Sequence, residues 1–200
     1  MKKIYLLVLP LCLTLSLMGQ KNFSDSITES RNTLTKNAML VLGSWSVVNI
    51  GTGLILSGQS NGENQYAWKM NVYWNVFNLG IAGLGYAGMR KALSGKNSFA
   101  ENEKAQQSIE KLYVFNTGLD LFYIAGGLFL IEKGQTESVP DKKYQFMGYG
   151  KSIIVQGGFL LAMDAVMYLL HHKNTRLLNK RLENFEINTG PGGIGLVHRF

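Results

Sequence analysis

Cysteine is nearly absent from this chain. Cys12 is the only one in 200 residues, and it lies inside the apolar N-terminal segment. Residues 1–19 have the pattern of a secretory signal peptide, in which Lys2 and Lys3 precede an apolar run that ends at Gly19. Cleavage after this peptide would remove the thiol. The mature chain is therefore expected to contain no disulfide, no thiolate nucleophile and no cysteine-bound metal.

Sequence motifs of common enzymes are also missing. The chain contains no HExxH and no P-loop. Gly83, Gly85 and Gly88 have the GxGxxG spacing, but no predicted strand precedes them, so close helix packing explains them better than a nucleotide site. The adjacent His171 and His172 are more typical of an interfacial anchor than of a metal site. We therefore expect no catalytic residue, no metal and no cofactor, and the protein is expected not to be an enzyme.

Charge is scarce and unevenly placed. Charged residues make up 16% of the chain and hydrophobic residues 46%. The charges collect between four apolar runs of about 20 residues, the length that a bilayer-spanning helix needs. These runs are residues 38–56, 68–89, 112–131 and 152–170. The sequence predicts an all-α protein, an integral membrane four-helix bundle over residues 38–171.

Two polar segments flank the predicted bundle. Residues 20–37 follow the signal peptide and are expected to enter the first helix with Asp25, Glu29 and Arg31 facing water. Residues 172–200 form a basic tail. The net charge of +7 arises from Lys and Arg beside the apolar runs, which indicates contact with anionic lipid rather than nucleic acid. The expected partners are the lipid bilayer and either a second copy of the chain or other envelope proteins.

Polar side chains inside the predicted spans are the candidate functional residues. An unpaired polar group is costly in hydrocarbon, so these side chains must face inward. On a helix, Asn71, Asn75 and Asn78 fall on one stripe, which Ala82 and Gly85 continue. The full candidate set is Asn49, Asn71, Asn75, Asn78, Asn116, Asp120, Gln156 and Asp164.

Two interpretations of these residues remain open. Counting along antiparallel spans places Asp120 and Asp164 within about 3 Å of the same depth at 1.5 Å per residue. Two carboxyl groups at one level favour a proton or cation site, because nearby like charges raise one pKa. The amides and acids can equally bridge helices and serve only to hold the bundle together.

The topology signals conflict. A signal peptide places residue 20 outside the cytoplasm, whereas the N-terminal segment, the linker 90–111 and the tail hold most of the Lys and Arg, which favour the cytoplasm. A small outer-membrane β-barrel is the alternative that resolves the conflict, and Ile194, Leu196, His198 and Phe200 alternate as in a last barrel strand. Helices are nevertheless preferred, because a strand would not bring the three asparagines to one face.

The motifs WSVVNIGTG, from Trp45, and MNVYWNVFNLGIAG, from Met70, carry a resemblance to a known family. Over about residues 30–170 the chain resembles a family of small, uncharacterised bacterial membrane proteins with a domain of unknown function. The resemblance implies a bacterial cell-membrane location, inner or outer, and no mechanism. We expect a non-enzymatic scaffold or subunit of a cell-envelope complex. A small transporter or proton- or cation-coupled channel that uses the intramembrane Asp residues is the alternative.

Overall fold

The structure is a computed structural model that describes residues 2–92, 99–183, 185–190 and 193–198, with side chains over 23–89 and 100–180. In this part of the chain four helices are followed by one hairpin of strands. The helices are α1 (Lys2–Gln59), α2 (Gly62–Ala92), α3 (Phe99–Thr136) and α4 (Pro140–Glu183). The strands β1 (Phe185–Gly190) and β2 (Gly193–His198) pair antiparallel.

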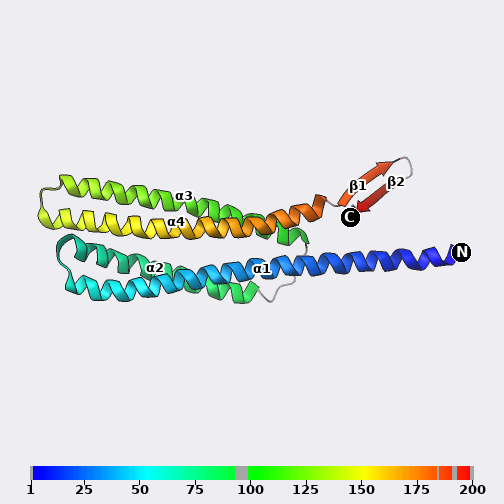
Figure 1. Cartoon of the computed structure of the whole chain (residues 1–200), viewed down its shortest axis with the longest axis horizontal. Helices are drawn as coiled ribbons and strands as arrows, with labels where there is room; N and C mark the ends of the chain where they lie inside the picture. Colours follow the sequence, from blue (N-terminus) through cyan, green and yellow to red (C-terminus); the bar gives the residue numbers. More distant parts are fainter. Residues whose placement is uncertain (1, 93–98, 184, 191–192, 199–200) are drawn as a thin grey trace.

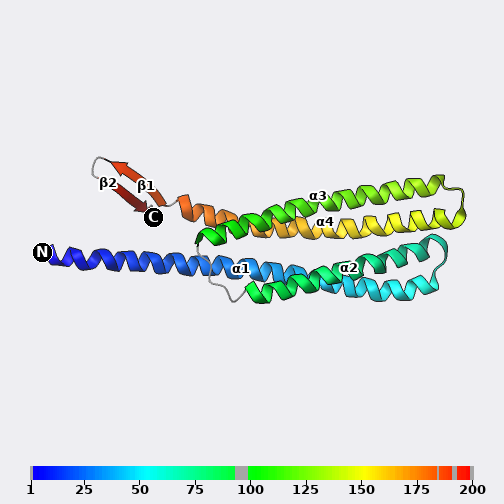
Figure 2. The same ribbon diagram turned by 180° about the vertical axis from the view of Figure 1, so that it is seen from behind.

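The helices form two long antiparallel hairpins that lie side by side (Figure 1). α1 packs on α2 and α3 packs on α4, and contacts of α2 with α4 join the two hairpins. The two short helix-to-helix turns lie at one end of the bundle, whereas both termini lie toward the other, as the reverse view also shows (Figure 2). We call these the turn end and the terminal end.

The short turns follow from local sequence. Gly62 begins α2 with a φ of 57°, a conformation that glycine adopts without steric cost. Pro140 occupies the first position of α4, where its missing N–H leaves no hydrogen bond unmade, and Asp141 follows it in the first turn. At the turn end Tyr66 donates a 2.7 Å hydrogen bond to Asp141, which ties α2 to α4 and raises the pKa of the Tyr66 phenol.

The distribution of polarity is the reverse of that in a water-soluble bundle. Among the described side chains, the buried polar residues outnumber the buried apolar ones, while large apolar side chains cover the outside of every helix. Phe77, Phe122 and Leu169, on α2, α3 and α4, are 70%, 72% and 65% exposed. On α1 this apolar band runs from Leu40 to Ile55, about 23 Å at 1.5 Å per residue, which approaches the thickness of a bilayer core.

Three of the helices are long and apolar enough to cross a membrane: Phe23–Gln59 in α1, Ala100–Thr136 in α3 and Pro140–Lys180 in α4. α2 contains the predicted span 68–89 but is not among them. Its asparagine stripe explains the difference, because Asn71, Asn75 and Asn78 lower the mean hydropathy of a helix whose outer face is apolar.

The prediction of an all-α four-helix fold is confirmed, and the alternative of a small β-barrel is wrong. The two strands at 185–198 pair only with each other in the described chain. The signal peptide stays a prediction, since α1 begins at Lys2 and continues without interruption through residues 20–37. The expectation that Arg31 faces water is wrong: Asp25 and Glu29 are exposed, but Arg31 is only 7% exposed. The side chains of the tail beyond 180 lie outside the described residues.

Candidate functional site

A cluster of amides joins three helices in the half of the apolar band nearer the turn end. Asn71 of α2 donates to Oδ1 and to the main-chain oxygen of Asn49 on α1, at 3.0 and 3.1 Å. Gln156 of α4 donates to Asn71 Oδ1 and accepts a 2.9 Å hydrogen bond from Trp45 Nε1 of α1. We call these four residues the amide cluster. They connect α1, α2 and α4 within a layer where lipid offers no hydrogen-bonding partner.

The helix period and one close helix approach place the amide cluster. Asn75 lies one turn after Asn71, is fully buried, and donates to the Asn71 main-chain oxygen at 2.8 Å. Gly53 lets α1 approach α2 here, because a Cβ at this position would lie 2.6 Å from Val72 Cγ2 and 3.1 Å from Trp68 O. Small residues allow such contacts between membrane helices.

The two buried acidic residues lie nearer the terminal end than the amide cluster does. Asp120 of α3 and Asp164 of α4 are both buried, at 3% and 4% exposure, and their side chains interact directly. Asn116, half-buried and one turn before Asp120, also interacts with Asp164. We call these three residues the acid pair and its amide. The structure thus brings Asp120 and Asp164 to one level, as counting along the spans suggests.

Several buried polar atoms of α2 and α3 have no partner among the described residues. They are Asp120 Oδ2, Asn78 Nδ2, Trp74 Nε1 and Asn75 Oδ1. The Trp74 ring packs edge-on against Tyr123 at 4.8 Å, which fixes the relative depth of α2 and α3. Asn78 is one turn from Trp74, and Asp120 is one turn from Tyr123, both toward the terminal end. Unpartnered donors and acceptors on the two helices therefore lie at similar depth, where water or an ion can satisfy them.

The eight predicted residues thus fall into two groups and not one. Asn49, Asn71, Asn75 and Gln156 form one network, while Asn116, Asp120 and Asp164 form the other with Asn78 near their level. The prediction did not include Trp45 or Ser46. Trp45 completes the amide cluster and stacks on Phe159 of α4 at 4.0 Å. Ser46 is fully buried but donates to Leu42 O of its own helix.

The sequence also gave no signal for a second polar layer at the terminal end. There the guanidinium of Arg31 donates to Asn102 Oδ1 at 3.1 and 3.2 Å, so that α1 is bound to α3. Asn102 also accepts from Thr28 at 2.6 Å and donates to Ser24. Asn174 of α4 completes the layer by exchanging hydrogen bonds with Ser30 of α1. Ser24, Arg31 and Asn32 of this segment therefore face a polar interior, whereas Asp25 and Glu29 are exposed.

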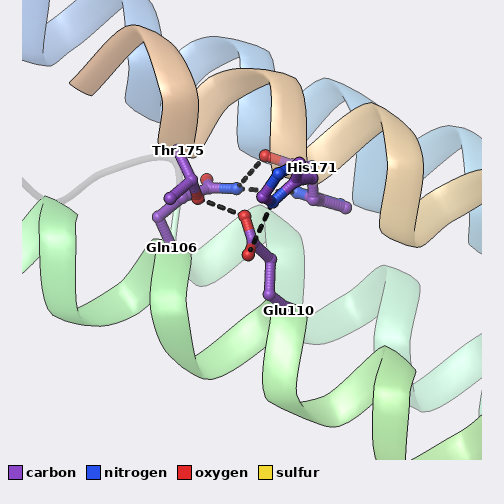
Figure 3. Close-up of polar contacts among 5 residues, drawn as sticks. Gln106, Glu110, His171 and Thr175 are labelled. Carbon is purple, nitrogen blue, oxygen red and sulfur yellow. Dashed lines mark hydrogen bonds and ion pairs between the residues drawn. The ribbon is translucent and has the colours of Figure 1, made fainter. Parts of the chain in front are cut away.

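α3 and α4 are joined next to this layer by the contacts drawn in Figure 3. Gln106 donates to the main-chain oxygen of His171 at 2.7 Å and lies 3.5 Å from its Nδ1. The contact with Nδ1 is a hydrogen bond in the tautomer that leaves Nδ1 unprotonated. Glu110 accepts from Thr175, and His172 Nδ1 lies 3.3 Å from its Oε2.

Residues 41–165 match the model of a family of unknown function, DUF6992. The chain belongs to this family. No curated protein and no solved structure matches it. The matched range begins where the apolar band begins on α1, and it contains both the amide cluster and the acid pair.

The range that matches DUF6992 ends before His171 and excludes the α1 and α4 residues of the terminal polar layer. Arg31 and Asn174 lie outside it, whereas Asn102 lies inside. In the described chain, no group of three or more His, Cys, Asp and Glu has the arrangement of a metal site. The site presents amides that form hydrogen bonds between helices and two carboxyl groups that interact with each other.

Proposed function

We propose that this DUF6992 protein is a non-enzymatic integral membrane protein that acts as a scaffold or subunit of a cell-envelope complex. The observation that carries the proposal is that the buried amides form hydrogen bonds between helices. Asn49, Asn71, Gln156 and Trp45 bond to one another across three helices. Such bonds hold a bundle in lipid, where apolar burial gives helices little reason to associate. The amides of this cluster are thus occupied by structural bonds, and the exposed apolar surface of the helices is left for partners.

Site-specific photo-crosslinking in native membranes tests the scaffold proposal. A photo-reactive amino acid placed at Phe122, which is 72% exposed, is expected to give one adduct of constant mass. The same group at the fully buried Asn75 is the matched control and is expected to give no intermolecular adduct. Size-exclusion chromatography with light scattering then measures the mass of the particle in mild detergent. A particle of one chain with no adduct from any exposed position contradicts the proposal.

The acid pair favours a second candidate function, a proton- or cation-coupled channel or small transporter. Asp120 and Asp164 are buried together, and Asp120 Oδ2 lacks a partner among the described residues. No Lys or Arg lies within the spans 112–131 and 152–170 to neutralise two carboxylates; Lys111 and Lys151 immediately precede these spans. A shared proton or a bound cation is the least costly way to keep both groups buried.

Flux through liposomes distinguishes the two functions. Reconstituted protein is expected to dissipate an imposed proton or cation gradient, and Asp120→Asn is expected to abolish that flux. Asp25→Asn removes an exposed acid outside the apolar band and is the matched control, which should retain flux. Liposomes with the unaltered protein that are as tight as empty ones rule out the second function and leave the scaffold proposal standing.

A further inference from the structure

A groove of about 540 Å³ lies on the surface of the α3–α4 hairpin, at the edge of the apolar band. Its lining is Gln107, Glu110, Lys111, Val114, Phe115 and Tyr168. Glu110 and Lys111 immediately precede Leu112, the first large exposed apolar residue among the described side chains of α3. The groove therefore begins in the polar interface of a bilayer and runs toward its hydrocarbon core.

The polar end of the groove presents a fixed carboxylate. Glu110 has a side chain that is only 14% exposed, and Thr175 and His172 hold its two oxygens from α4 (Figure 3). Each carboxylate oxygen accepts more than one hydrogen bond, so capacity for a further donor remains. Lys111, the next residue, is exposed and takes part in no ion pair within the described chain. A negative and a positive group thus stand side by side at the interface.

The other end of the groove is apolar. Val114 and Phe115 are 57% and 64% exposed, one turn deeper than Glu110 and Lys111. Tyr168 forms the α4 wall, where its ring is stacked on His172 at 5.6 Å. From the interface inward the groove therefore offers an anion, a cation and an apolar surface.

We propose that this groove binds a phospholipid with a primary ammonium headgroup. The ammonium donates to Glu110, the phosphate lies on Lys111, and an acyl chain covers Val114 and Phe115. From the interface inward, such a lipid presents its ammonium, its phosphate and then its acyl chains, which is the order in which the groove presents Glu110, Lys111 and its apolar residues. The residues that line the groove follow α3 from Gln107 to Phe115, so the groove runs along the helix as the lipid does. A primary ammonium donates N–H groups to a carboxylate and a quaternary choline does not, so the groove distinguishes the two headgroups. The inference requires that the bundle lies in a bilayer, but it depends on neither proposed function.

Native mass spectrometry of the delipidated full-length protein in detergent tests the proposal. Phosphatidylethanolamine and phosphatidylcholine with identical acyl chains are added separately, and bound lipid is counted. We expect one tightly bound phosphatidylethanolamine, retained about tenfold better than phosphatidylcholine, as one charge-assisted hydrogen bond allows. Equal retention of both lipids in the unaltered protein overturns the proposal without any variant.

Two variants, Glu110→Gln and Lys111→Glu, locate the bound lipid, and Glu132→Gln is the control. Glu110→Gln keeps an oxygen for Thr175 but removes the charge, and it is expected to abolish the preference between the lipids. Glu132→Gln alters an exposed acid at the turn end of the same helix and should leave the preference intact. Lys111→Glu changes only an exposed side chain and is expected to weaken retention of both lipids about tenfold by placing a like charge beside the phosphate. A preference that survives Glu110→Gln, or unchanged retention in Lys111→Glu, overturns the proposal.

Discussion

Trp45 Nε1 donates a 2.9 Å hydrogen bond to Gln156 Oε1 and so joins α1 to α4 across the bundle. The same Gln156 side chain donates to Asn71 of α2. One amide thus satisfies partners on two other helices. If it were removed, Trp45 Nε1 would lose its acceptor, and Asn71 Oδ1 would keep only the 3.3 Å hydrogen bond from Asn75 of its own helix. Gln156 therefore joins the α3–α4 hairpin to both helices of the α1–α2 hairpin.

Replacement of Gln156 by Leu, which has a similar size, is expected to lower the free energy of unfolding by about 1–2 kcal/mol. The cause is the loss of partners for Trp45 and Asn71 and not a cavity. Val155→Leu is the matched control, because Val155 is the preceding residue of α4 and is exposed. Thermal unfolding in detergent, followed by circular dichroism, measures both variants. Equal melting temperatures for Gln156→Leu and the unaltered protein would remove the amide cluster from the account of stability.

Asn75→Leu is expected to lower the melting temperature by less than Gln156→Leu does. The Asn75 amide is fully buried, but its hydrogen bonds return to Asn71 on its own helix, at 2.8 Å to the main-chain oxygen and 3.3 Å to Oδ1. Leucine therefore removes only an intrahelical support of Asn71, at a cost of about 0.5–1 kcal/mol. The same unfolding measurement ranks the two variants. A larger loss from Asn75→Leu than from Gln156→Leu would show that the unpartnered Asn75 Oδ1 binds something across the bundle.

The asparagine stripe of α2 was predictable from sequence because helix geometry is periodic. Residues at i, i+4 and i+7 share a face whatever lies opposite, and Asn71, Asn75 and Asn78 are all buried. The common depth of Asp120 and Asp164 was predictable for a related reason, since a short turn fixes the register of an antiparallel pair. The all-α class follows from the same pattern.

The partners of these stripes were not predictable, because a local pattern does not specify which helix lies opposite. The contact of Trp45 with Gln156 joins residues 111 positions apart in the sequence. The burial of Arg31 was predicted wrongly for a different physical reason. A polar helical face looks the same whether it meets water or a polar core, and only the partner helices, with Asn102 and Asn174, distinguish the two cases.

Gly127→Ala is expected to destabilise the α3–α4 hairpin by about 1–3 kcal/mol through overpacking. A Cβ at Gly127 would lie 2.7 Å from Gly150 O and 2.7 Å from Ile154 Cγ1, so one helix must move away. Gly126→Ala is the matched control, because nothing lies within 4 Å of a Cβ there. This control is expected to stabilise slightly, since alanine favours a helix by about 0.5–1 kcal/mol over glycine. Chemical unfolding in detergent measures the difference, and a Gly127→Ala protein as stable as Gly126→Ala contradicts the close packing.

Asn102→Leu is expected to loosen the terminal polar layer by about 2–3 kcal/mol, because it leaves the Arg31 guanidinium buried without its acceptor. Limited trypsin digestion in detergent provides a local measurement, since Arg31 is only 7% exposed in the intact layer and should become cleavable when the layer opens. Lys104→Leu, two residues further along α3 at an exposed position, is the control that should leave Arg31 protected.

The double change Asn102→Leu with Arg31→Met removes the charge together with its acceptor, and replacement of both partners by apolar groups is close to neutral. It should therefore restore the melting temperature toward that of the unaltered protein. A double variant no more stable than Asn102→Leu alone would show that the cost arises from Ser24 and Thr28, the other partners of Asn102, and not from the buried guanidinium.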